Sequence, residues 1–437
     1  MAQFGTFATH HSLEVDDAML AEAFDRLWTR LADNYPFGHP HYVGQMLKPP
    51  HPAAVIGYLS AMLINPNNHA LDGGPATARM EREVVSRLAV MLGLPRHLGH
   101  LTSSGTIANL EALWVARELH PGAAIAYSAD AHYTHARMCR VLGVEGIAIA
   151  SDARGRMDLD DLERVLDRNR VGTVVATLGT TGLGALDPLP QVTALARAHG
   201  TRVHVDAAYG GFFSLIADDT ADGVEAAPFA AIASVDSVVI DPHKHGLQPY
   251  GCGAVLFADP GVGRLYSHDS PYTYFTSDEL HLGEISLECS RAGASAAALW
   301  LTTEVLPLTP EGLGQVLRAN RRGAVEWAAL LRESSGLRLY QDPELDIVTL
   351  FPDRPTLSQV DEASAELFAA SGRGPAQEQL HLALYAADAR AFASRGHLAR
   401  ADTDRARIIR SVLMKPESAE IVPWIHHRLV SLSEGAG

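Results

Sequence analysis

Short apolar runs alternate with longer segments of helical period from about Gly99 to about Ala258. Each run is continuous rather than alternating, which indicates strands buried on both faces, as in a parallel sheet covered by crossover helices. The predicted strands are AAIAYS, GIAIA, GTVVATL, RVHVDAA, SVVID and GAVLF. One predicted helix is MDLDDLERVL, in which Asp158 can cap the first turn. The pattern predicts an α/β fold with a mostly parallel central sheet flanked by helices.

The chain on either side of this region has a different pattern. Before it, an amphipathic helix, DDAMLAEAFDRLWTRLADN, is followed by a loop rich in Pro and His, GHPHYVGQMLKPPHP. After it, the Ala-rich stretch LECSRAGASAAALWLTTEVL leads into a second region of helices and strands. We therefore predict an N-terminal arm over 1–55, a large α/β domain over 56–311 and a small α+β domain over 312–437.

Composition limits the partners of the chain. A formal net charge of -16 with only 35 Lys and Arg residues argues against binding to nucleic acid. Cys139, Cys252 and Cys289 are odd in number and far apart, which favours a reducing compartment over a disulfide framework. The first residues resemble no secretory leader, and no apolar stretch is long enough to cross a bilayer. These features predict a soluble, cytoplasmic protein with neither a nucleic-acid nor a membrane partner.

Polar sequence directly after each predicted strand is where an open α/β sheet would bind a ligand. In LTSSGTIANLEAL, the residues Ser104, Gly105 and Thr106 stand at the start of a long helix. Backbone N–H groups and hydroxyls there can hold a phosphate against the positive end of the helix. A helix cap without any ligand would give the same pattern.

A carboxylate ends another predicted strand, in the segment VHVDAAYGG. A buried carboxylate such as Asp206 needs a partner, and the small residues after it would let a flat ring approach closely. In an enzyme that uses pyridoxal 5'-phosphate (PLP), the protonated pyridine nitrogen is that partner. The alternative is a structural aspartate that pairs with arginine or caps the next helix.

Two further motifs complete the set. Lys244, in DPHKH, lies in a turn between two wholly apolar strands, and partial desolvation of a lysine favours the neutral amine that Schiff-base chemistry requires. In AYSADAHYTHARM, His132 follows one strand and precedes a helix. His132 and His135 lack the further ligands of a zinc site, so no metal is expected.

Taken in order, these motifs resemble the group II PLP-dependent decarboxylases of the aspartate aminotransferase fold, fold type I. The matching segments span almost the whole chain and are HPHYVGQM, TSSGTIAN, SADAHYTH, VVATLGTTGLGALDPL, VHVDAAYGG, DPHKH and IIRSVLMKP. The resemblance implies a homodimer with active sites at its interface, in which PLP serves the decarboxylation of an L-amino acid to the corresponding amine.

The resemblance also implies roles for individual residues. Lys244 would form the internal aldimine with PLP, Asp206 would pair with the pyridine nitrogen, and His132 would stack on the ring face opposite Ala208. Thr177 would lie near the phenolic oxygen of the cofactor. The residues implied around the phosphate are Ser104, Gly105, Thr106, Asp241 and His243.

Substrate contacts are implied at four positions. Arg410 matches an arginine that binds a substrate carboxylate in some members, and Arg291, in CSRAGAS, is a second candidate for an anionic group. Gln45 and Lys48 match positions near the substrate side chain, where Lys48 favours an acidic amino acid. An exposed surface lysine is the alternative.

The resemblance implies that Tyr272 or Tyr274 protonates the reacting carbon after carbon dioxide has left. Two departures from the family pattern bear on the pocket: His245 replaces the usual Trp after the lysine, and Ile107 replaces a frequent acidic residue. Carbon–carbon lysis, transamination, cyclisation or a catalytically silent PLP-binding protein remain alternatives, since the bond that breaks depends on how the substrate is held.

Overall fold

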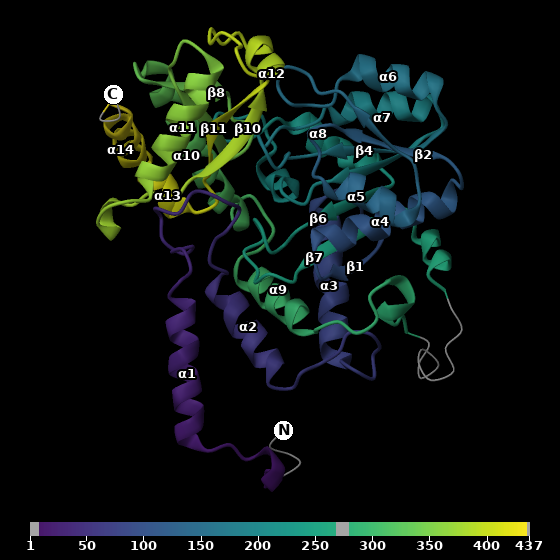
Figure 1. The fold of residues 1–437 in the computed structure, drawn as a ribbon. Helices are drawn as coiled ribbons and strands as arrows, with labels where there is room; N and C mark the ends of the chain where they lie inside the picture. Colours follow the sequence, from purple (N-terminus) through teal and green to yellow (C-terminus); the bar gives the residue numbers. More distant parts are fainter. Residues whose placement is uncertain (1–7, 268–278, 435–437) are drawn as a thin grey trace.

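The computed structural model describes residues 8–267 and 279–434. Its larger sheet has seven strands in the order β1-β7-β6-β5-β4-β2-β3 (Figure 1). These strands are β1 (Leu98–Thr102), β2 (Ala124–Ser128), β3 (Gly146–Ile149), β4 (Val171–Thr177), β5 (Arg202–Asp206), β6 (Ser237–Ile240) and β7 (Gly253–Phe257). Neighbours from β6 through β3 pair in parallel, whereas β7 runs antiparallel to both β6 and β1. The predicted α/β fold is confirmed.

Helices cover both faces of this sheet, as its fully apolar strands require. Buried side chains of α4 (Gly105–Leu119) and α5 (Thr134–Leu142) pack on one side. The larger core, on the other side, includes buried residues of α3 (Pro75–Met91), α6 (Leu159–Arg168), α7 (Leu189–Ala198), α8 (Ala226–Ala230) and α9 (Ala294–Val305). As predicted, Asp158 caps α6, where its Oδ1 accepts the N–H of Asp161 at 2.8 Å.

At the edge of the large sheet formed by β1 and β7, one strand was not predicted and the other runs in an unexpected direction. The strand β1, LGHLT, was not predicted, because its His100 and two small or polar residues break the apolar run. The predicted strand GAVLF forms β7 but runs against its neighbours. A continuous apolar run gives no information on strand direction, so the sequence pattern could not distinguish the two orientations.

The second, smaller sheet is fully antiparallel, in the order β10-β11-β9-β8. Its strands are β8 (Leu337–Gln341), β9 (Ile347–Pro352), β10 (Ala383–Asp388) and β11 (Arg405–Val412). The helices of this unit are α10 (Leu313–Glu333), α11 (Leu357–Ser371), α12 (Ala389–Ser394), α13 (Pro416–Glu420) and α14 (Val422–Glu434). Trp327, Leu350, Ile409 and Ile425 lie in its core, and the unit sits beside the large sheet (Figure 1).

The N-terminal segment projects from the rest of the molecule (Figure 1). The helix α2 (Pro52–Met62) packs on α9, closely enough that a Cβ at Gly57 would lie 2.9 Å from the Ala297 carbonyl oxygen. By contrast, α1 (Asp17–Leu31) buries none of its residues. In the described part of the chain, no helix has the length and hydropathy needed to span a membrane.

Candidate active site

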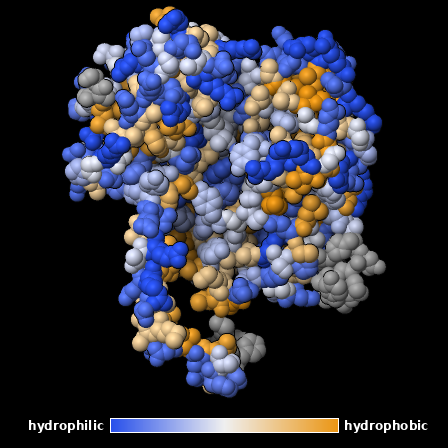
Figure 2. All heavy atoms as spheres, in the orientation of Figure 1, coloured by the Kyte–Doolittle hydropathy of each residue, from blue (hydrophilic) through white to orange (hydrophobic). Residues whose placement is uncertain are grey.

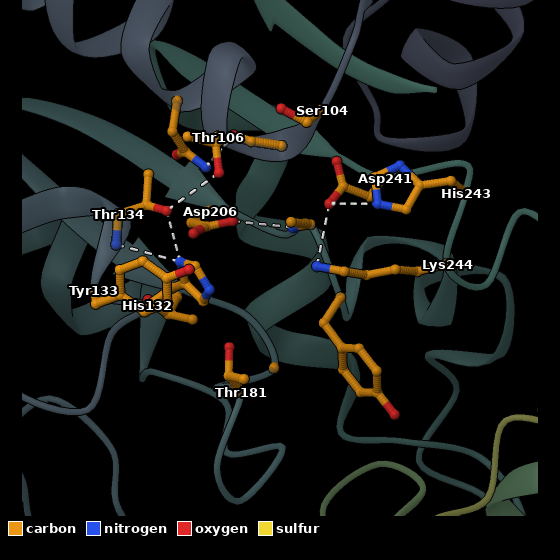
Figure 3. A pocket seen from close by; sticks show the side chains of 16 residues that line it. Ser104, Thr106, His132, Tyr133, Thr134, Thr181, Asp206, Asp241, His243 and Lys244 are labelled. Carbon is orange, nitrogen blue, oxygen red and sulfur yellow. Dashed lines mark hydrogen bonds and ion pairs between the residues drawn. The ribbon is translucent and has the colours of Figure 1, made fainter. Parts of the chain in front are cut away.

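Three parallel strands end side by side at one edge of the large sheet. β4 ends at Thr177 and β5 at Asp206, and these two residues are register partners, while β6 lies on the other side of β5. A cavity of about 230 Å³ opens at these ends (Figure 3). The topology therefore gathers the polar residues that follow each strand into one site, as expected for an α/β sheet. The lining residues are Ser104, Gly105, Thr106, Asn109, His132, Tyr133, Thr134, Thr177, Gly179, Thr181, Asp206, Ala208, Tyr209, Asp241, His243 and Lys244.

Lys244 reaches into this cavity from the turn after β6 (Figure 3). Its Nζ lies 3.1 Å from Asp241 Oδ2, and its side chain is 20% exposed. A Cβ at Gly105 would lie only 2.5 Å from the same carboxylate oxygen, so glycine is needed where the start of α4 meets Asp241. The amine is thus partly shielded from water and held beside a single carboxylate.

Asp206 lies at the base of the cavity and is buried. Its Oδ2 accepts a hydrogen bond from His135 Nε2 at 2.9 Å, and its Oδ1 accepts the Ala208 N–H at 3.1 Å. Burial alone would raise the pKa of Asp206, but the hydrogen bond and charge of His135, with the charge of Lys244, bring that pKa well below its usual range. The carboxylate is therefore negative and can hold a proton on a ligand nitrogen.

His132 lines the cavity from the loop before α5. Its Nδ1 accepts the Thr134 N–H at 3.2 Å and lies 2.7 Å from the Thr134 hydroxyl, which leaves the ring proton on Nε2. Burial lowers the pKa of His132, and the charge of Lys244 lowers it further. A neutral, fixed imidazole is suited to lie flat against an aromatic ligand.

The start of α4 forms the polar end of the cavity. Ser104 is the N-cap residue, and its hydroxyl accepts the Ile107 N–H at 3.3 Å. The Thr106 hydroxyl lies 3.4 Å from that of Thr134, and the His243 ring is fixed by a 2.7 Å hydrogen bond from Nδ1 to the Cys252 carbonyl. Because the first N–H groups of a helix lack intrahelical acceptors, this end can bind a phosphate.

An unsatisfied hydroxyl helps to identify the ligand. Thr177 Oγ1 is buried at the cavity and has no hydrogen-bond partner within residues 8–267 and 279–434. Buried polar atoms are nearly always hydrogen-bonded, so a polar ligand atom is expected there. PLP fits the site, because its phenolic oxygen, pyridine nitrogen and phosphate match Thr177, Asp206 and the α4 start. Fold and site together define a PLP-dependent enzyme.

Comparison with known proteins identifies the family. The model of the pyridoxal-dependent decarboxylase conserved domain matches residues 36–351. An L-aspartate decarboxylase of Thermococcus kodakarensis is 29% identical over 334 residues, covering 75% of this chain and 83% of that protein. An L-tyrosine decarboxylase of Enterococcus faecium is 28% identical over 389 residues, covering 67% of this chain and 64% of that protein. The chain belongs to the pyridoxal-dependent decarboxylase family and is a PLP-dependent carboxy-lyase acting on an amino acid.

Solved structures share the fold. Mouse CSAD superimposes with a TM-score of 0.81 at 23% identity, covering 96% of this chain and 90% of that chain. Oryza sativa TDC, solved with PLP and tryptamine, gives a TM-score of 0.82 at 18% identity, covering 98% of this chain and 91% of that chain. At these identities the likeness concerns the fold alone.

Arg410 lies close to the cavity but does not line it. Its guanidinium donates to the carbonyl oxygens of Thr181 at 2.6 Å and Gly182 at 3.1 Å, in the loop after β4. A third contact, at 3.4 Å, joins it to Gln45 Oε1. The structure thus brings Arg410 and Gln45 together beside Thr181, a lining residue of the cavity.

Arg291 lies elsewhere. It lines a separate cavity of about 220 Å³ that includes Ser103 and Glu288. Its Nη1 donates to Glu81 Oε1 at 2.8 Å and also to the Leu101 carbonyl. The structure therefore does not bring Arg291 to the Lys244 cavity. Tyr272 and Tyr274 lie outside the described residues, and their role stays a prediction.

Lys48 is not among the residues that line the cavity, but its charge acts on His243, which does line it. Burial lowers the pKa values of His51 and His243, and the charge of Lys48 lowers them further. Tyr250 ties this segment in place, since its hydroxyl donates to the Met46 carbonyl at 3.0 Å and its ring lies 4.9 Å from that of His243.

Sequence reasoning missed two groups of residues around the site. His135 was considered only as a metal ligand, although it lies three residues after His132 and holds Asp206. Tyr209, which lines the cavity, contacts Asp346 of the smaller unit, as does His245, which the sequence singled out only as a departure from the family pattern. No sequence motif links Asp346 to the lysine turn.

The chain contains only three lysines, Lys48, Lys244 and Lys415. Lys415 is buried, and its Nζ donates to the carbonyl oxygens of Tyr42, Phe37 and Leu47, in the segment that also carries Lys48. The amine that binds PLP can therefore be identified among very few candidates.

Replacing Lys244 with Ala should prevent covalent attachment of PLP and lower turnover by roughly 10⁴-fold or more, as when other covalent catalytic groups are removed. Borohydride reduction of the holoenzyme, followed by peptide mass spectrometry, should locate PLP on Lys244 in the wild type. The variant Lys48→Gln serves as the control and should keep this adduct. A reduced adduct on Lys48 or Lys415 in the wild type would contradict the assignment.

Proposed function

We propose that the enzyme decarboxylates a small acidic L-amino acid, with PLP held on Lys244, and releases the corresponding amine. The observation that carries the substrate class is a pair of cations near the cavity, Arg410 and Lys48. Neither forms an ion pair with any carboxylate of residues 8–267 and 279–434. A substrate with two carboxylates would give each cation a partner. The relatives named L-aspartate decarboxylases support this choice.

The protein residues prepare the cofactor and the substrate. PLP, when bound, withdraws the electron pair left at the α-carbon as carbon dioxide departs. Asp206, kept negative by His135, would hold the proton on the pyridine nitrogen. His132 and Ala208 would lie on the two faces of the ring, and Thr177 would donate to its phenolic oxygen.

Arg410 positions the substrate in this proposal. The Thr181 and Gly182 carbonyls fix two of its nitrogens, so the guanidinium is oriented before substrate arrives. Such preorganisation reduces the entropy lost on binding and would orient the carboxylate that departs. We retain Tyr272 or Tyr274 as the proposed proton donor to the α-carbon.

Incubation of the holoenzyme with a panel of carboxyl-labelled amino acids tests the reaction. Aspartate or glutamate should release labelled carbon dioxide and an equal amount of amine, because only these carry a second carboxylate. Release from tyrosine alone would refute the acidic substrate class. A keto acid or aldehyde without carbon dioxide would indicate another PLP reaction, and no product from any amino acid would indicate a silent homologue.

Lys48 should make substrate binding depend on pH. Burial lowers the pKa of Lys48 to about 7, with a further contribution from the charge of Lys415. The amine is charged below this pH and binds a carboxylate, and it becomes neutral above it. KM for an acidic substrate should therefore rise as pH increases from about 6 to 8.5.

The variant Lys48→Gln isolates this effect. At pH 6, KM for the acidic substrate should rise about 10-fold, equivalent to roughly 1.4 kcal/mol, and its pH dependence in this range should flatten. Steady-state kinetics on tyrosine, if the enzyme accepts it, provide the control, because its side chain offers no carboxylate to Lys48. An unchanged KM profile in Lys48→Gln would rule out this role.

The proposed assembly is a homodimer, supported by the uncovered apolar face of α1. Figure 2 shows apolar surface where α1 and α2 project below the rest of the molecule. Such large apolar residues on one projecting helix favour burial against another protein surface. Those on α1 that are at least 50% exposed are Met19, Leu20, Phe24, Leu27 and Trp28.

The double variant Phe24→Asp with Trp28→Asp should convert the dimer to monomer and remove most activity, because the sites are proposed to lie at the interface. Sedimentation velocity of the holoenzyme reports the assembly. As a control, Glu22→Ala on the same helix removes an exposed charge and should leave the dimer intact. A wild-type monomer with full activity would contradict the proposal.

We also propose a cytoplasmic enzyme of amino acid metabolism, divided into the arm 1–55, the large domain 56–311 and the small domain 312–437. The three cysteines are free, with Cys139 and Cys252 buried, which supports a reducing compartment.

A further inference from the structure

We propose that His245 and Asp346 form a buried ion pair that positions Lys244, so that the smaller unit of the fold holds the catalytic lysine in place. The pair acts through the backbone of Lys244 and does not touch the reacting atoms. This inference rests on the proposed function in one respect, namely that Lys244 carries the cofactor.

With Asp346 ionised, as suits its hydrogen bond from the Tyr209 hydroxyl, both ring nitrogens of His245 face acceptors. Nε2 lies 2.8 Å from Asp346 Oδ2, and Nδ1 lies 3.0 Å from the Tyr209 carbonyl oxygen. A carbonyl oxygen and a carboxylate are both acceptors, and only the imidazolium form donates from both nitrogens. The side chains of His245 and Asp346 are 1% and 0% exposed. Two opposite charges therefore face each other away from water.

Tyr209 is the third member of the buried group that His245 and Asp346 form. Burial and the neighbouring Asp346 raise the pKa of Tyr209, so its hydroxyl stays protonated and donates to Asp346 Oδ1. The rings of Tyr209 and His245 lie 4.6 Å apart, edge to face, and the ring of Phe213 also meets that of His245 edge to face, at 4.8 Å. Because Tyr209 follows Ala208 and lines the cavity, the group supports two sides of the cofactor site.

The Asp346 carboxylate that contacts His245 comes from the smaller unit, which is distant from His245 in the sequence. Asp346 directly precedes β9, and its backbone carbonyl accepts the Leu413 N–H at 3.0 Å from the end of β11. Arg321 and Arg410 are the other cations whose charges act on Asp346. A buried pair that loses one member leaves an uncompensated charge, so either substitution should displace the lysine turn.

The residue two positions earlier provides a matched control. Glu344 also joins the two units, through Arg156 at 2.8 Å and the Leu186 N–H at 2.9 Å, and it is largely buried. It contacts neither His245 nor the Lys244 turn. Glu344→Gln should therefore loosen the junction of the units without displacing the lysine.

The test compares His245→Gln, Asp346→Asn, the double variant and Glu344→Gln as holoenzymes. We expect kcat to fall between about 10-fold and 100-fold in both single variants, with KM within about threefold, because misplacement of a catalytic group lowers kcat. The visible absorption band of bound PLP should shift in both. The double variant should lose no more than the worse single variant, as expected for one shared interaction.

Glu344→Gln should lower the unfolding temperature while kcat stays within about threefold and the PLP band does not move. The proposal is overturned if His245→Gln and Asp346→Asn behave like Glu344→Gln, or if their losses in kcat multiply in the double variant. Should His245→Gln fail to fold, Tyr209→Phe removes a single hydrogen bond to Asp346 and must shift the PLP band in the same direction.

Measurements on the wild type distinguish failure of the proposed function from failure of the positioning role of His245 and Asp346. It would appear in the wild type, as a missing PLP adduct on Lys244 or as no carbon dioxide from any amino acid. Failure of the present inference would appear only in the variants, with the wild type fully active.

Discussion

The negative charge of Asp206, held out of contact with water, is the constraint on which the site depends. Removing an ionised carboxylate from water is unfavourable unless donors and cations surround it. Here the donors come from α5, through His135, and from the chain directly after β5, while the nearest lysine comes from the turn after β6. Each of these elements must be in place before the carboxylate is stable. The order of β4, β5 and β6 in the sheet is therefore as much a part of the site as the side chains.

Much of the site could be predicted from sequence because it lies at strand ends. His132, Asp206 and Lys244 each stand one to four residues past an apolar run, and parallel pairing brings such positions to one edge. Local sequence therefore contains both the strand and the functional residue that follows it. The same reasoning predicted the α/β fold, but it could not predict that β7 runs antiparallel, because buried strands of either direction are uniformly apolar.

The remainder depends on contacts between distant segments. Asp346 lies 101 positions from His245, and the carboxylate that engages Arg291 lies 210 positions away. Nothing in CSRAGAS distinguishes an arginine that binds substrate from one that binds Glu81. Likewise, the departure from the family pattern at His245 was visible in the sequence, but its partner was not. Tertiary pairing decides the role of such residues, and one sequence contains no direct record of it.

The scarcity of lysine has a consequence for how the molecule responds to alkaline solution. Apart from Lys48, Lys244 and Lys415, every basic side chain other than histidine is arginine, which stays protonated at any pH that a folded protein tolerates. Within residues 8–267 and 279–434, the exposed ion pairs are formed by arginine or histidine, so their arginine charges are kept. Burial lowers the pKa of Lys48 to about 7 and of Lys415 to about 8. Mild alkali thus discharges two buried amines of the N-terminal and C-terminal segments, one of which acts on His243 of the cavity, while the arginines of the exterior keep their charge. The charge near the cofactor site can therefore be varied without breaking the arginine ion pairs that help to maintain the fold.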